Sequence, residues 1–335
     1  MINLFFKKLF GKIPSTRKYT RKLELVRSEL QKFNELTESS KLLRYKELEA
    51  IVLSSEHINK RNETKKLQYK ESQEYQLDIE YGTLKKDEEI KWYFKKLKKN
   101  NFEPHRNWKL VFDDTFKTLD TDKWLTIPLH GMISLNNHSY VTEDNLQFHT
   151  ENKNLKLQEN CLSIETRQEK TSGRKWRPET GFQIEDFDYT SGLINTGHSF
   201  RLKGGLIEVV ARMSNAKEIV HAVSLKSDAM VPHIDMFCTG MKKKFKVRMF
   251  LNNNPKPDFE EIFKGINLNK KIHYSLEWAE NQLIWRINGF TIAEYHGKMP
   301  AKQMYISISS VILHKPKNLP AQFAIESVRV FEKQK

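Results

Sequence analysis

From Trp108 onward, the chain is a succession of short apolar or alternating runs separated by turn residues, and this pattern most constrains the fold. Such runs are typical of strands, because successive side chains of a strand point to opposite faces. Asn288-Gly289, directly after one run, is a strong signal for a tight hairpin turn. Many short strands without intervening helices predict an antiparallel sandwich or barrel. The clearest runs are 155–157, 162–166, 206–210, 283–287 and 305–308.

The first 107 residues have a helical periodicity instead. Within residues 19–53, apolar side chains recur every three or four positions, and Ser39-Ser40 indicates a break between two helices. Residues 54–70 are polar and fit either a loop or a solvated helix. A further helix is expected to begin after Asp87, as its N-cap, and to continue to Lys99.

A boundary near Pro104 divides the chain into a basic α-helical arm, 1–107, and a β-sandwich, 108–335. The helices of the arm are able to pair as a short coiled coil. The arm carries 25 Lys and Arg against 16 Asp and Glu, and the remainder carries 32 against 26. This balance favours anionic partners, whether nucleic acid, acidic lipid or acidic glycan. A composition rich in Lys, Asn, Ile and Glu throughout the chain is the simpler explanation for most of this positive charge.

Residues 1–13 are a candidate interfacial helix, with apolar side chains on one helical face and lysines on the other. Such a helix is able to lie on an anionic membrane or to dock on a partner, and packing on its own protein is an equal alternative. The apolar face comprises Ile2, Phe5, Phe6, Leu9, Phe10 and Ile13.

No apolar run is long enough to span a bilayer, and the first residues lack the unbroken apolar centre of a secretory signal. Cys161 and Cys238 are the only cysteines, too few for a disulfide framework. We therefore expect a protein that is cytoplasmic, peripheral to a membrane or part of a virion.

Several segments of residues 108–332 occur in an order and spacing that resemble a known family. They include a Ser-Gly strand, a Gly-x-x-Glu-x-x-x-Arg strand and a Trp-containing hairpin that ends in Asn-Gly. The segments are 110–124, 154–164, 189–196, 205–213, 274–289 and 304–308. Together they resemble the family 16 glycoside hydrolases, which implies an antiparallel jelly-roll β-sandwich of the concanavalin A-like lectin/glucanase type. The resemblance does not extend to the arm.

The strand 232–238 reads Pro-His-Ile-Asp-Met-Phe-Cys and occupies the place of the family's catalytic strand. A retaining glycosidase needs a nucleophilic carboxylate and a protonated carboxyl about 5 Å apart. The family presents them as Glu-x-Asp-x-Glu or, with a bulge, Glu-x-Asp-x-x-Glu, so that three carboxyls share one face. The resemblance places His233 at the nucleophile, Asp235 at the assisting residue and Phe237 or Cys238 at the acid/base. Both outer carboxylates are replaced under either residue spacing, which implies a degenerate catalytic site.

The expected sugar platform is also reduced, because residues 218–225 contain no aromatic where the family usually has tryptophan. Trp176 is able to replace it, or to pack as a rim residue. The candidate ligand-binding residues are Trp176, His221, His233 and Asp235.

No metal site is predicted, since the histidines, Asp235 and Cys238 lack compact ligand spacing. Thr115 replaces a Glu that the family associates with structural calcium. No cofactor is expected.

These observations favour a non-catalytic glycan-binding or adhesion protein, although enzyme activity stays open. One alternative is a structural or assembly component, for example of a virus particle or a surface-polysaccharide complex, with a protein partner bound by helices of 1–107. Another is an active β-glycan hydrolase or transglycosylase. Nucleic-acid binding is not expected, because the basic cluster 242–248 accompanies no recognised motif.

Overall fold

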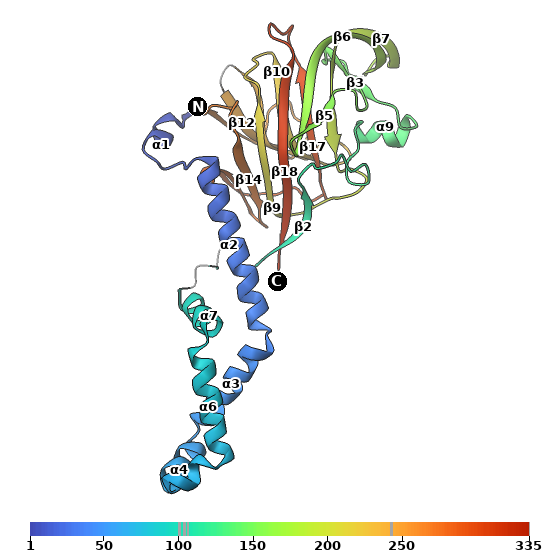
Figure 1. Ribbon diagram of the computed structural model, residues 1–335. Coiled ribbons are helices and arrows are strands. Elements are labelled where there is room, and N and C mark those ends of the chain that lie inside the picture. The colour runs from blue at the N-terminus through green and yellow to red at the C-terminus, as the bar shows by residue number, and fades with distance from the viewer. Residues whose placement is uncertain (100–101, 103–104, 106, 242–243, 335) are drawn as a thin grey trace. The chain divides into compact units, whose positions relative to one another are not determined.

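The computed structural model describes residues 1–99, 102, 105, 107–241 and 244–334 (Figure 1). The chain forms two compact units. One consists of Met1–Thr20 with Trp108–Lys335, and the other of Arg21–Asn107. The structure thus differs from the expected arm of 1–107 at one end, because residues 1–20 belong to the sandwich unit.

The described strands of the sandwich unit form two mainly antiparallel sheets (Figure 1). The fold is the predicted jelly-roll β-sandwich. The first sheet has seven strands, in the order β1 (Ile2–Asn3), β13 (Phe259–Lys264), β12 (Lys244–Phe250), β11 (His233–Met241), β10 (Ile219–Lys226), β17 (Tyr305–Ile312) and β8 (Leu193–Asn195).

The second sheet has eleven strands among the described residues, three of them attached beside its main path. Its main path runs through β16 (Phe290–His296), β15 (Gln282–Ile287), β14 (Ile272–Trp278), β9 (Gly205–Met213), β18 (Ala321–Lys333), β6 (Cys161–Arg177), β7 (Gly181–Ser191) and β4 (Gln147–His149). The attached strands are β2 (Trp108–Asp114), β3 (Tyr140–Thr142) and β5 (Leu155–Gln158). A short helix, α9, spans Leu129–Ser134.

The five strand runs expected from the sequence lie in β5, β6, β9, β15 and β17, which confirms those predictions. The predicted hairpin turn is also confirmed, since Asn288 and Gly289 join β15 to β16 with φ of 48° and 76°. Between the sheets, aromatic rings from both sides interdigitate. Phe259 stacks on Trp285 with ring centroids 5.2 Å apart. Such pairs fix the spacing of the two sheets and leave each with one outer face.

Residues 1–20 attach to the sandwich. Ile2 pairs with Phe263 at the edge of the first sheet, and Leu4 and Ile13 are buried in the sandwich core. Helix α1 covers only Phe5–Leu9, so the expected amphipathic helix over residues 1–13 was wrong in its length and in its faces.

The unit Arg21–Asn107 is helical and has its own apolar core. Its helices are α2 (Thr16–Thr37, which begins in the sandwich unit), α3 (Ser40–Val52), α4 (Ser55–Glu63), α5 (Lys66–Lys70), α6 (Gln73–Lys86) and α7 (Glu88–Lys99). Asp87 accepts hydrogen bonds from the backbone N–H groups of Glu89 and Ile90, as predicted for an N-cap. Residues 54–70 are mostly helical, and α6 was not predicted.

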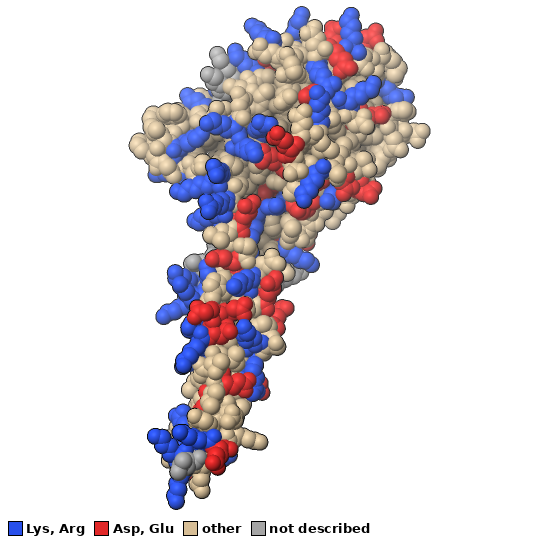
Figure 2. All heavy atoms as spheres, in the orientation of Figure 1, with Lys and Arg blue, Asp and Glu red and all other residues tan. Residues whose placement is uncertain are grey.

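The surface of the helical unit carries both signs of charge interleaved (Figure 2). Arg44 pairs with Glu80 at 2.7 Å, and Lys41 with Asp87 at 3.1 Å. Exposed pairs of this kind contribute little to stability, but they keep the unit's surface solvated. None of the helices in the described parts of the chain is long and apolar enough to cross a membrane.

Candidate functional site

The register of β11 decides which side chains share the face of Asp235. In the ladder with β10, Ser224 lies opposite Asp235, whereas Val223 lies opposite Phe237. Met236 is therefore an extra residue, a β-bulge, and it turns Phe237 toward the interior. There the Phe237 ring stacks on Tyr274 of the second sheet, with centroids 4.0 Å apart. The next residue, Cys238, returns to the face of Asp235, which we call the outer face of the first sheet.

Asp235 is held by several partners on this face and is only 2% exposed. Arg248 donates to its Oδ2 from Nε and Nη2, both at 2.7 Å, and Ser224 Oγ donates to Oδ1 at 2.6 Å. His233 Nε2 lies 3.6 Å from Oδ1. Burial alone would raise the pKa of Asp235, but interaction with His233 and the charge of Arg248 outweigh burial and lower the pKa. Asp235 is thus an ionised, fully engaged carboxylate and is unsuited to donate a proton.

The two flanking positions offer no carboxyl. The His233 ring stacks on Phe250 with centroids 4.5 Å apart. Cys238 is 1% exposed, and burial, followed by the charge of Asp235, raises the pKa of its thiol well above the ordinary value. A thiol that stays protonated is a poor nucleophile, because the thiolate is the reactive form.

His221 does not join this group, which corrects its assignment as a ligand-binding candidate. It faces the interior with no exposed surface. Its Nδ1 lies 2.8 Å from Ser310 Oγ and its Nε2 lies 3.0 Å from Ser214 Oγ. Burial lowers the pKa of His221 to about 3, so the ring is a neutral, satisfied core histidine.

Trp176 belongs to β6 in the second sheet, opposite Phe182 of β7 and beside Thr142 of β3. It is 39% exposed, and its partner Thr142 lines the pocket described below. No group of three or more His, Cys, Asp or Glu among the described residues is arranged to hold a metal ion.

The basic cluster 242–248 lies partly on the outer face. Along β12, Phe245, Val247 and Met249 are buried, and the residues between them take the opposite face. Those residues are Lys244, Lys246, Arg248 and Phe250, paired with β11 residues that include Asp235 and Cys238. Residues 242 and 243 of the cluster lie outside the described residues. The strand alternation therefore places several cations on the face of Asp235.

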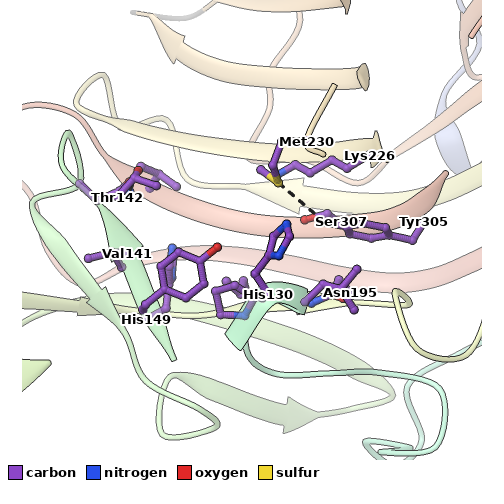
Figure 3. A pocket seen from close by; sticks show the side chains of 15 residues that line it. His130, Val141, Thr142, His149, Asn195, Lys226, Met230, Tyr305 and Ser307 are labelled. Atoms are coloured by element: carbon purple, nitrogen blue, oxygen red, sulfur yellow. Dashed lines mark hydrogen bonds between the residues drawn. The ribbon is translucent and has the colours of Figure 1, made fainter. Parts of the chain in front are cut away.

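Beside this group, a pocket of about 140 Å³ lies over β10, β17 and β8 (Figure 3). Lys226 and Met230 reach it from one side, and His130 and His149 from the other. Lys226 pairs across the ladders with His233 on β11 and with Tyr305 on β17. The pocket is thus continuous with the strand that carries Asp235. No pattern in the sequence indicated this pocket, because its lining comes from elements far apart in the chain.

Most of the sandwich unit matches a known protein family. Residues 136–327 match the family described as glycosyl hydrolases family 16. The chain belongs to this family. No curated protein matches it.

Solved structures support the family's fold. The chain resembles the laminarinase catalytic domain from Thermotoga maritima, with 18% identity, a TM-score of 0.56, and 68% of this chain and 100% of that one covered. For the endo-β-1,3-glucanase from Pyrococcus furiosus, the values are 17%, 0.55, 68% and 95%. For LamAcat from Zobellia galactanivorans they are 21%, 0.53, 67% and 98%. At these identities the likeness establishes the fold.

In this family 16 chain, the strand that the sequence resemblance aligns with the family's catalytic strand carries His233, Asp235 and Cys238 on one face. A retaining mechanism requires a nucleophilic carboxylate and a proton-donating carboxyl across the scissile bond. On β11 one ionised carboxylate is present, and it is already neutralised by Arg248. Its single carboxylate is therefore engaged within the sheet, and the strand carries no second carboxyl on this face.

Proposed function

We propose that this family 16 chain is a non-catalytic glycan-binding protein. The observation that carries the proposal is the bulge at Met236, which returns a buried thiol, Cys238, to the face of Asp235. The sequence resemblance assigns this position to the acid/base. His233 takes the nucleophile position, and Asp235 is committed to Arg248. Together these replacements remove the pair of carboxyl functions on which glycoside hydrolysis by the retaining route depends.

The family supports a glycan as the ligand. The similar solved structures are named laminarinases and endo-glucanases, enzymes that act on polysaccharides. This chain keeps a pocket and an outer face with polar and basic side chains, so the scaffold that presents a sugar is retained. The altered strand favours recognition over cleavage, since function depends on the site rather than on the fold.

The test measures binding and cleavage in parallel. A glycan array followed by calorimetry should find at least one bound polysaccharide, while the same polysaccharide releases no reducing ends. A laminarinase incubated with laminarin serves as the positive control for cleavage. Reducing-sugar release that disappears in Asp235→Asn would overturn the proposal in favour of a hydrolase or transglycosylase. Absence of binding across neutral and acidic glycans would also overturn it.

A second candidate function is attachment to a membrane surface, and a specific observation favours it. Phe5, Phe6, Leu9 and Phe10 are between 51% and 74% exposed, although Leu4 and Ile13 fix their segment to the sandwich core. Lys7, Lys8 and Lys12 are exposed beside them. Exposed aromatic side chains flanked by lysines suit the interface of an anionic bilayer, where each lysine contributes about 1 kcal/mol.

Co-sedimentation with phosphatidylserine vesicles tests this attachment. The full chain should sediment with these vesicles, and Phe6→Ser with Phe10→Ser should release it. A matched control is Leu25→Ser with Leu53→Ser, which removes two exposed apolar side chains from the helical unit. Equal sedimentation of both double variants would count against a membrane role for α1.

A protein partner for the helical unit is the remaining proposal, corresponding to an assembly role. It is supported by the separate core of this unit, built around residues such as Leu48, Tyr81 and Tyr93. Pull-downs with the full chain and with a chain lacking residues 21–107 should differ in the proteins retained. A monodisperse monomer that retains the same proteins in both forms would exclude this role.

A further inference from the structure

The pocket in Figure 3 has an unusual balance of charge. Among the described residues that line it, Lys226 is a cation and none is a carboxylate. The polar groups beside it are neutral side chains, including Asn145, Asn195 and Ser307. A half-open pocket with a cation and no carboxylate in its lining favours a negatively charged occupant.

Lys226 has no hydrogen bond or ion pair with the parts of the chain that the structure describes. The carboxylate nearest in the ladder, Asp235, already accepts from Arg248 and Ser224. Burial lowers the pKa of Lys226, and the charge of Asp235 offsets only part of that effect. The ammonium group therefore carries a desolvation cost that an incoming anion would relieve.

His149 supplies a second, independent observation. It lines the same pocket, is 5% exposed, and its Nδ1 has no hydrogen-bond partner within the described residues. Buried polar atoms usually find partners, and this one, in the wall of the pocket, has none among the described residues. Burial, with the charge of Lys226, lowers the pKa of His149 to about 3, so this ring contacts a ligand as a neutral group.

We propose that this pocket binds the acidic substituent of a glycan, a carboxylate or a sulfate ester, with Lys226 as its counter-ion. The inference rests on the proposed glycan-binding function and names the class of ligand. A cavity of about 150 Å³ holds a molecule the size of benzene, so this pocket of about 140 Å³ has room for a carboxylate or sulfate group, with the rest of the sugar at its open side.

The outer face beyond the pocket extends the same chemistry. Lys244, Lys246 and Arg248 lie on this face along β12, and Lys264 of β13 is paired with Lys244. Glu260 of β13 offsets part of this charge through an ion pair with Lys246 at 3.1 Å. A polyanionic glycan that places one acidic unit at Lys226 would meet further cations along the sheet, which favours acidic over neutral polymers.

Matched ligands test the pocket without knowledge of the polymer's linkage. Methyl β-glucuronide and methyl β-glucoside differ only in the carboxylate, and glucose 6-sulfate is compared with glucose. Binding to the full chain is measured by calorimetry and by the shift of the thermal unfolding midpoint. At least one acidic ligand should bind about tenfold or more tightly than its neutral counterpart, as expected for a charge-assisted hydrogen bond.

Variants assign the effect to Lys226. Lys226→Met should abolish the preference for the acidic ligand, whereas Lys226→Arg, which keeps the charge, should retain it. Lys109→Met is the matched control, because it removes the same charge from β2 of the other sheet. Should Lys226→Met unfold, the loss of preference on acetylating wild-type lysines, prevented by bound acidic ligand, provides a second measurement.

The outcomes separate this inference from the proposed function. If neutral glycans bind the array and acidic ligands show no advantage, the inference is overturned and the glycan-binding function stands. If no glycan binds the array but glucuronide still discriminates wild type from Lys226→Met, the anion pocket stands and the glycan-binding function fails. Equal binding of acidic and neutral ligands to wild type and Lys226→Met overturns the inference directly.

Discussion

Asp235 and Lys226 lie on neighbouring strands of the same outer face, but the two charges differ in how far the protein compensates them. Asp235 is surrounded by Arg248, Ser224 and His233, so its charge is compensated inside the protein. Lys226 borders a pocket and has no such set among the described residues. A buried charge with every partner in place stabilises one arrangement of the sheet, whereas a partly buried charge without partners, such as that of Lys226, is a cost that binding can recover. The comparison divides the outer face into a structural half at β11 and β12 and a half over β10 and β17, which we propose to be the ligand-binding half.

The largest expected effect on stability comes from removing the counter-ion of Asp235. Arg248→Met leaves the carboxylate of Asp235 buried without its main counter-ion, so the free energy of unfolding should fall by about 3 kcal/mol. Urea denaturation at neutral pH measures this loss. Arg329→Met is the control, because its ion pair with Asp113 is largely exposed and should contribute less than about 1 kcal/mol. Equal losses in the two variants would contradict the structural role of Arg248.

Lowering the pH should remove the stabilising contribution of ionised Asp235 from the wild-type chain. The pKa of Asp235 is lowered on folding from an ordinary value of 3.8, so its contribution to stability is complete above that value and is lost as pH falls through the folded pKa. Between about pH 6 and pH 3, wild type should lose about 1 kcal/mol more than Asp235→Asn. Urea denaturation across this range checks the slope. Asp122→Asn, at an exposed position, should keep the wild-type slope.

Much of the structural half could be predicted from local patterns. The alternation along 244–250 and the Asn288-Gly289 turn each require only neighbouring residues, because strand faces and turn types are local properties. The resemblance located β11, but it left Phe237 and Cys238 as alternatives. Only the pairing of β11 with β10 fixes the bulge at Met236, since a bulge is defined by the partner strand.

The ligand-binding half could not be predicted in the same way. Lys226 reads as an ordinary strand lysine, and its isolation depends on α9, β3 and β4 closing over it. His221 was misassigned because its strand parity, rather than its residue type, turns it toward Ser214 and Ser310. Likewise, the pattern of residues 1–13 fits an amphipathic helix, but pairing of Ile2 with Phe263 reorganises the segment. Each of these outcomes depends on contacts between residues distant in the sequence.

Because Lys226 lacks a counter-ion among the described residues, we predict that binding of an acidic ligand depends on pH. An anion favours protonated Lys226, whose pKa is lowered by burial, so affinity for an acidic ligand should be constant below that pKa and should fall about tenfold as pH rises through it. Lys226→Arg should remove the dependence, since its guanidinium stays charged. Calorimetry from about pH 8 upward avoids ordinary histidine titration, which is centred near 6.5. The titratable groups that face Lys226 or line its pocket are Asp235, His233, Tyr305, His130, Tyr140 and His149.

The neighbouring groups should not mimic this dependence. Burial raises the pKa of Tyr305 to about 12 and also raises the pKa of Tyr140, so both stay neutral through the lower part of the range. Asp235 stays ionised and His149 stays neutral there. An identical fall of affinity in Lys226→Arg would assign the titration to another group and break the contrast between the two halves.

The smallest expected effect concerns stability without ligand. Lys226→Met removes a desolvated cation and keeps an apolar side chain of similar length, so the free energy of unfolding should be unchanged or rise by up to about 1 kcal/mol at neutral pH. Because the pKa of Lys226 is lowered on folding, the charge costs most below the folded pKa, and the advantage of methionine should shrink as pH rises through it. Urea denaturation at two pH values measures both. A loss of more than about 1 kcal/mol would mean that Lys226, like Asp235, is stabilised from within the protein, and the site would then lack the uncompensated charge that draws an anion.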